Sequence, residues 1–125
     1  MQNKTNMFQK TLKSFLHAWK GIRHAYSHEL SFRMEVWAGL ILALVGWLLR
    51  PIMETEIMFL LLAYVLVLAF ELINTALERM FQRLHPEHHE LVGISKDLAA
   101  SAVLMAILFA GAIVMIIALR RFGIL

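Results

Sequence analysis

Three apolar segments, separated by short polar stretches, limit the fold of this chain more than any other feature of its sequence. They lie at about residues 34–50, 57–80 and 98–119. A helix needs about 20 mostly apolar residues to cross the hydrocarbon core of a bilayer. In water, the same segments would expose large apolar patches, which favour aggregation. The pattern predicts an all-α membrane protein that forms one domain over residues 1–125, with three transmembrane helices.

The composition agrees with a membrane protein and excludes several other classes. Hydrophobic residues make up 60% of the chain, charged residues make up 17%, and the mean hydropathy is +0.68. There is no cysteine, which excludes a disulfide, a thiol nucleophile and a cysteine-containing zinc site. The net charge of +3 is modest and no stacking aromatics alternate with the basic residues, so nucleic-acid binding is not expected. The first residues do not resemble a signal peptide, and we expect the chain to insert through its own helices.

Residues 7–27 form an amphipathic stretch ahead of the first apolar segment. Its apolar residues recur at helical spacing, at Phe8, Leu12, Phe15, Leu16, Trp19 and Ile22. Its basic residues fall largely on other faces, at Lys10, Lys13, Lys20 and Arg23. This pattern is typical of a surface helix in the headgroup region, with its cations near lipid phosphates. The alternative is an amphipathic helix on a soluble core, but the rest of the chain offers no such core.

The charges between the apolar segments predict the orientation of the chain in the membrane. Basic residues precede the first segment, at Lys4, Lys10, Lys13, Lys20, Arg23 and Arg33. Others lie between the second and third segments, at Arg79, Arg83 and Lys96. Residues 51–56, which we interpret as a tight acidic turn after Arg50, carry Glu54 and Glu56. The positive-inside rule therefore places the N-terminus and the second loop in the cytoplasm, although Arg120 and Arg121 disagree with this orientation.

One group of polar residues follows the second apolar run. Glu71, Asn74, Thr75 and Glu78 are spaced i, i+3, i+4 and i+7, so they share one face of a helix. Glu71 falls close to the hydrocarbon boundary, where a carboxylate is costly and is usually functional or paired. We expect the short second loop to return Lys96 and Asp97 to the same level, with Glu29 and Arg33 at the start of the first segment.

These residue types suit phosphoryl transfer. Carboxylate and amide oxygens are the hard ligands that Mg²⁺ prefers, and the ion commonly bridges to substrate phosphates. Lys96 can neutralise phosphate charge, and a further carboxylate can position or deprotonate an attacking hydroxyl. The alternative is structural: Glu71 and Glu78 would pair with Lys96 or Arg79 and hold a helix bundle together. Spacing alone leaves both interpretations open.

The histidines form two groups. His85, His88 and His89 lie around Pro86, and we interpret them as a solvated or nucleotide-contacting loop because no helical spacing supports a metal site. His17, His24 and His28 lie along the amphipathic stretch and are expected at the interface. The chain has no GxxxxGK[ST] phosphate loop and no protein-kinase signature set, so a kinase of either familiar type is excluded.

Two longer blocks resemble the prokaryotic diacylglycerol kinase family. Residues 70–107, FELINTALERMFQRLHPEHHELVGISKDLAASAVLMAI, are similar to its pattern E-x-x-N-[ST]-A-[IL]-E, a short loop, then K-D-x-[AG]-[AS]-x-A-V. Residues 18–37, AWKGIRHAYSHELSFRMEVW, are similar to its W-K-G-[IL]-R and E-x-x-F-R-x-E elements. The resemblance covers about residues 8–119 and both blocks are specific.

The resemblance implies a homotrimer in the bacterial cytoplasmic membrane that uses Mg²⁺ and transfers the γ-phosphoryl group of ATP to a lipid hydroxyl on the cytoplasmic side. Carried onto matching positions, it makes Glu71 the general base, and makes Glu29 and Glu78 the metal ligands. The nucleotide and its phosphates would contact Lys10, His17, Glu29, Asn74, Glu78, Glu87, His88, His89, Lys96 and Asp97. The lipid would contact Trp19, Arg33 and Glu71.

The chain departs from the family pattern at two positions. Gln82 stands where an Asp is common, and His17 stands where a Tyr is common. We expect the replacement of a carboxylate with an amide to affect the affinity for metal and nucleotide more than the reaction itself.

The sequence features distinguish four candidate functions. HELVGISKD and ELSFRME look more like the diacylglycerol branch of the family than the undecaprenol branch. The expected reaction is therefore phosphorylation of diacylglycerol to phosphatidic acid, with undecaprenol as the alternative substrate. A small oligomeric transporter would predict carboxylates deeper in the bilayer. A purely structural subunit would need no polar face of this kind.

Overall fold

The computed structural model describes residues 2–48, 51–84 and 89–125. The described residues form four helices and no strand: α1 (Gln2–His28), α2 (Leu30–Leu48), α3 (Glu54–Leu84) and α4 (Glu90–Arg121). The all-α fold is therefore confirmed. Among these helices, α2, α3 and α4 are long and apolar enough to cross a membrane, which confirms three spanning candidates.

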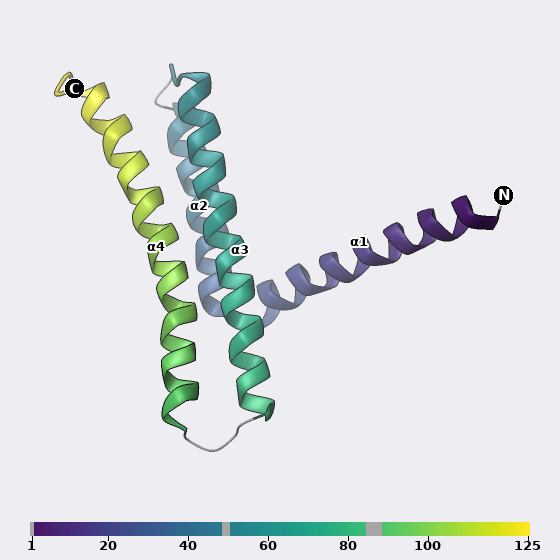
Figure 1. Ribbon diagram of the computed structural model, residues 1–125. Coiled ribbons are helices and arrows are strands. Elements are labelled where there is room, and N and C mark those ends of the chain that lie inside the picture. The colour runs from purple at the N-terminus through teal and green to yellow at the C-terminus, as the bar shows by residue number, and fades with distance from the viewer. Residues whose placement is uncertain (1, 49–50, 85–88) are drawn as a thin grey trace.

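The three apolar helices lie side by side and α1 projects away from them (Figure 1). α4 packs most extensively on α3, and α2 also packs on α3, behind it in the view of Figure 1. α1 meets α2 and α3 at its C-terminal end, and the rest of the helix extends outward, as an interfacial helix would. The C-terminus lies near the α2–α3 connection, whereas the α3–α4 connection lies at the opposite end of the bundle.

Two helix boundaries differ from the sequence interpretation. The predicted turn over residues 51–56 is wrong in its last part, because α3 already begins at Glu54. Carboxylates in a first turn are stabilised by the helix dipole, and Glu56 Oε2 accepts a hydrogen bond from the Met53 backbone nitrogen at 3.0 Å. At the other end of the bundle, α4 begins at Glu90, well before the apolar segment. Asp97 therefore lies inside a helix rather than at its start.

The interior of the bundle is small. Its buried apolar residues are Ala25, Phe32, Ala63, Val67, Val103 and Ala106. Small residues allow two helix backbones to approach closely, and four of these lie on α3 and α4, the most closely packed pair. Large apolar side chains cover the outside instead; Leu40 is 54% exposed and Met105 is 71% exposed. This surface suits a surrounding of lipid or of other helices.

The end of α4 is tied to the connection between α2 and α3. Arg120 Nη1 lies 3.6 Å from Glu56 Oε1, and Arg120 Nη2 lies 3.9 Å from Met53 Sδ. Arg121 Nη2 donates to the backbone oxygen of Pro51. The two arginines that disagree with the positive-inside rule therefore have local partners, and the acidic first turn of α3 offsets the charge of one of them.

Candidate active site

Glu29 lies at the junction of α1 and α2 and is bound by an arginine of α3. Arg79 donates to Glu29 Oε1 from Nε at 3.1 Å and from Nη2 at 2.5 Å. Both contacts go to the same oxygen, and Oε2 takes part in neither. The junction stays helix-like, because the Glu29 nitrogen donates to the Ala25 oxygen at 2.8 Å. The carboxylate is thus fixed where α1, α2 and α3 meet.

A buried polar group lies further along α2 and α3. Glu71 is 5% exposed although it is a carboxylate. Glu35 Oε2 and Asn74 Oδ1 are also buried, and neither has a hydrogen-bond partner among the residues that the structure describes. Glu35 lies close enough to Glu71 for the two carboxylates to repel each other. Buried polar atoms are nearly always paired, so these acceptor oxygens indicate a place for a donor: a hydroxyl, a cation or water.

Tyr64 of α3 makes a close contact with α2 near this polar group. Tyr64 Oη donates to the Val36 backbone oxygen at 3.2 Å. The Tyr64 ring lies against Gly39, and a Cβ at Gly39 would overlap ring atoms. Glu35 lies about one turn before Gly39, and Glu71 lies about two turns after Tyr64. The glycine therefore allows α2 and α3 to approach closely near the two carboxylates.

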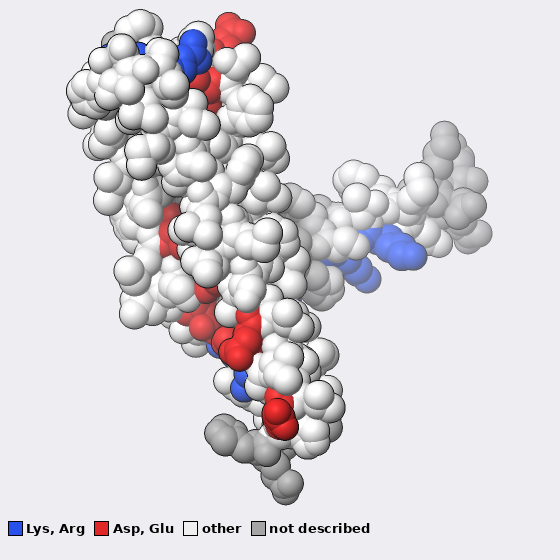
Figure 2. All heavy atoms as spheres, turned by 60° about the vertical axis from the view of Figure 1, so that its left-hand side comes forward, with Lys and Arg blue, Asp and Glu red and all other residues white. Residues whose placement is uncertain are grey.

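The other predicted residues of the bundle lie toward the α3–α4 connection. Glu78 and Lys96 are half-buried and Asp97 is exposed. In this half of the bundle, acidic side chains follow one face (Figure 2). The expected polar face on α3 is present, and α4 returns Lys96 and Asp97 to the same half of the bundle.

Several predicted site residues are not brought to this group within the single chain. Lys10, His17 and Trp19 are exposed on the part of α1 that projects from the bundle. Glu87 and His88 lie outside the described residues. Their roles stay predictions. His89 caps the N-terminus of α4, where its Nδ1 accepts from the Leu91 nitrogen at 3.3 Å, so its ring is fixed at a helix start.

Sequence reasoning missed three residues of the site. Glu35 was not singled out, although a carboxylate inside an apolar helix is itself a signal. Tyr64 carries no such signal, because its role depends on the facing Gly39. Arg79 was considered as a partner for Glu71 or Glu78, but within the described residues its ion pair is made with Glu29. The structural alternative, in which Arg79 pairs with Glu71 or Glu78, is therefore not supported by this ion pair.

The oxygen ligands present fit a magnesium ion. The described residues contain no group of three or more His, Cys, Asp or Glu side chains that could hold a metal. Mg²⁺ does not need such a cage, since it commonly takes one or two carboxylates, with waters and substrate phosphates as its other ligands. The carboxylates of Glu29 and Glu78 are hard oxygen donors of this kind.

The chain matches a known protein family over most of its length. A family profile described as "Prokaryotic diacylglycerol kinase" matches residues 16–118, which include Glu29, Glu35, Glu71, Glu78 and Lys96. This chain belongs to the prokaryotic diacylglycerol kinase family. The predicted family is confirmed, and the chain is a lipid kinase.

Relatives of this kinase carry two names. Diacylglycerol kinase of Escherichia coli (strain K12) is 36% identical over 110 residues, which cover 88% of this chain and 89% of the relative. Diacylglycerol kinase of Haemophilus influenzae is 31% identical over 108 residues, covering 86% and 91%. Undecaprenol kinase of Bacillus subtilis (strain 168) is 34% identical over 99 residues, covering 78% and 79%. Both substrates therefore occur among its relatives, and the kinase has a nucleotide donor and a lipid alcohol acceptor.

Proposed function

We propose that this kinase phosphorylates diacylglycerol to phosphatidic acid, with ATP as donor and Mg²⁺ as cofactor, at the cytoplasmic face of the bacterial inner membrane. One observation supports this most: Glu71 is a buried carboxylate on an apolar helix, and among the described residues Glu35 Oε2 and Asn74 Oδ1 are buried oxygens without a hydrogen-bond partner. A lipid alcohol is the donor that can reach such a place from within the bilayer.

In the proposed reaction, Glu71 accepts the proton of the lipid hydroxyl. As that proton leaves, the lipid oxygen forms a bond to the γ-phosphorus, and the bond from this phosphorus to the β–γ bridging oxygen breaks to release ADP. Before transfer, the single hydrogen of the lipid hydroxyl would be shared between Glu71 and Glu35 Oε2 in a three-centre hydrogen bond. A general base contributes about 10²–10⁴-fold to such a reaction.

The remaining polar residues would serve the nucleotide. Glu29 and Glu78 would hold the magnesium ion, which supplies charge neutralisation to the transferring phosphoryl group when bound. Lys96 would contact phosphate oxygens from α4, with Asp97 and Asn74 beside it. Arg79 fixes Glu29 through the bonds described above, so its role is to position a metal ligand.

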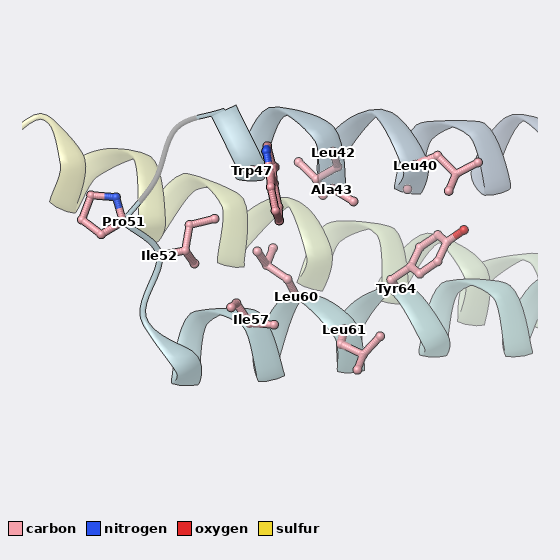
Figure 3. A pocket seen from close by; sticks show the side chains of 12 residues that line it. Leu40, Leu42, Ala43, Trp47, Pro51, Ile52, Ile57, Leu60, Leu61 and Tyr64 are labelled. Carbon is pink, nitrogen blue, oxygen red and sulfur yellow. The ribbon is translucent and has the colours of Figure 1, made fainter.

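A cavity between α2 and α3 supports a lipid acceptor (Figure 3). It measures about 690 Å³ and lies on the side of Tyr64 away from Glu71. Its walls are almost entirely apolar, from Leu40 to Trp47 on α2 and from Ile57 to Leu61 on α3. Pro51 and Ile52 line the end near the α2–α3 connection. The hydrocarbon tail of the acceptor would lie here, with its hydroxyl toward Glu35.

Undecaprenol is the second candidate acceptor. The Bacillus subtilis relative is named for this substrate, and an apolar cavity takes a polyprenyl chain as well as an acyl chain. The proposed chemistry at the hydroxyl is the same for both.

The test is phosphate transfer from radiolabelled ATP in mixed micelles, with diacylglycerol and undecaprenol offered separately. Glu71→Gln removes the proposed base, and Glu54→Gln on the far end of the same helix is the matched control. Magnesium-dependent label on diacylglycerol that is lost in Glu71→Gln and kept in Glu54→Gln supports the proposal. Label on undecaprenol alone would show that diacylglycerol is not the substrate, while the proposed mechanism would still hold. No label on either lipid would contradict the function.

A further inference from the structure

Two histidines near the end of α1 form a pair that the proposed reaction does not use. His24 and His28 are four residues apart and share one face of the helix. Their ring centroids are 4.2 Å apart and the ring planes differ by 22°, so the imidazoles are stacked. Both side chains are exposed. Two imidazoles are thus held side by side where an ion and its waters can reach them.

A hydrogen bond fixes which nitrogen of His28 is available. His28 Nδ1 lies 3.0 Å from the His24 backbone oxygen. A carbonyl oxygen only accepts, so Nδ1 carries the hydrogen and the Nε2 of the neutral ring keeps its lone pair. Histidines that bind metals almost always donate their other ring N–H to a carbonyl or carboxylate in this way. In this tautomer, His28 offers Nε2 as the ligand atom.

We propose that His24 and His28 bind a divalent transition-metal ion of the Zn²⁺, Cu²⁺ or Ni²⁺ class, at a site separate from the carboxylates assigned to magnesium. Imidazole nitrogen suits these ions, whereas Mg²⁺ prefers oxygen. Tetrahedral zinc with bonds of about 2.0–2.1 Å needs the two nitrogens about 3.3 Å apart. In the proposed complex, the exposed rings would rotate out of the stacked arrangement so that one nitrogen of each reaches that separation. Waters complete the coordination.

An ion bound by His24 and His28 would lie next to Glu29. His28 is the last residue of α1, and Glu29 follows it directly. An ion on the pair adds positive charge beside Glu29 and holds the last turn of α1 helical. Because Glu29 is a proposed magnesium ligand, this consequence rests on the proposed function, whereas the binding itself does not.

The experiment measures metal binding directly on tag-free, metal-stripped protein in detergent micelles. Zn²⁺ is titrated against a chromophoric zinc chelator in the presence of excess Mg²⁺, and Cu²⁺ is examined by electron paramagnetic resonance for coupling to imidazole nitrogen. The variants are His24→Gln, His28→Gln and the double variant, with His17→Gln as the matched control on the same helix. Circular dichroism checks that each variant keeps its helices.

We expect one Zn²⁺ site in the unaltered protein that survives excess Mg²⁺ and the His17→Gln change. Either single change at the pair should weaken it by at least the roughly 10- to 100-fold that loss of an outer-shell partner costs. Equal zinc affinity in the unaltered protein and the double variant would overturn the proposal, as would loss of the site in His17→Gln. Because the readout is binding, an inactive kinase would leave the result interpretable.

Discussion

Arg79 binds Glu29 across 50 residues of sequence with two nitrogens on one carboxylate oxygen. The pair connects the α1–α2 junction to the half of α3 that carries Asn74 and Glu78. The two side chains remain 47% and 26% exposed, and exposed ion pairs contribute about 0–1 kcal/mol to stability. Its main effect is therefore on the position of Glu29 rather than on the free energy of unfolding.

Arg79→Gln should weaken magnesium activation more than it weakens the fold. Losing a partner of a metal ligand costs roughly 10- to 100-fold in metal affinity, while the unfolding free energy should change by about 1 kcal/mol or less. The apparent Mg²⁺ affinity is read from phosphate-transfer rates, and stability from thermal unfolding in the same micelles. Arg79→Lys should restore part of the magnesium affinity. A large loss of stability with an unchanged magnesium requirement would contradict the positioning role.

Glu35→Gln should act on the lipid and leave the nucleotide unaffected. A hydrogen bond to a charged group contributes about 1.5–3 kcal/mol, so kcat/KM for the lipid should fall roughly 10- to 100-fold. The KM for ATP should stay the same. Stability should not fall, because Gln keeps the size of the side chain and removes the repulsion between this position and Glu71. An unchanged lipid dependence would show that Glu35 does not contact the hydroxyl.

Gly39→Ala should disturb the contact between α2 and Tyr64. Overpacking of this kind costs about 1–3 kcal/mol, and the shift of α2 should also lower phosphate transfer. The change Tyr64→Ala in the same chain removes the ring that the new Cβ would meet. The double variant should therefore lose less stability than the sum of the two single changes, which thermal unfolding of all three variants measures. Simple additivity would argue against the contact.

Gln82→Asp restores a carboxylate that is common in the family at an exposed position of α3. If that carboxylate serves the nucleotide or its metal, the KM for MgATP should fall while the KM for the lipid stays the same. Gln82→Asn is the matched control for side-chain length. Equal KM values for MgATP in all three proteins would show that the departure at this position has no cost.

The spanning helices and the polar face of α3 could be predicted from the sequence, because both depend on local regularities. Apolar length predicts a spanning helix, and i, i+3, i+4 and i+7 spacing predicts a shared face. Glu71, Asn74 and Glu78 are on one helix in the structure for this reason. The start of α3 at Glu54 was missed because a capping hydrogen bond, rather than hydropathy, sets it.

The remaining features of the site depend on how the helices meet, and one sequence without an alignment does not contain that information. The Glu29–Arg79 pair joins residues far apart in the chain, and the close approach of Gly39 to Tyr64 joins α2 to α3. The structural alternative paired Glu71 and Glu78 with Lys96 or Arg79, whereas the ion pair of Arg79 is made with Glu29. Local spacing along one helix does not determine the contacts between helices.

The contacts of Arg120 and Arg121 also bear on how the chain acquires its topology during synthesis. Translocation machinery reads flanking cations before tertiary contacts exist, and cations at both ends of this bundle make the reading ambiguous. Glu56 lies across from Arg120 and neutralises part of one signal, but it can do so only after α4 has reached α3. The Arg120–Glu56 contact therefore becomes available only after α4 has packed, as a tie between the end of α4 and the start of α3.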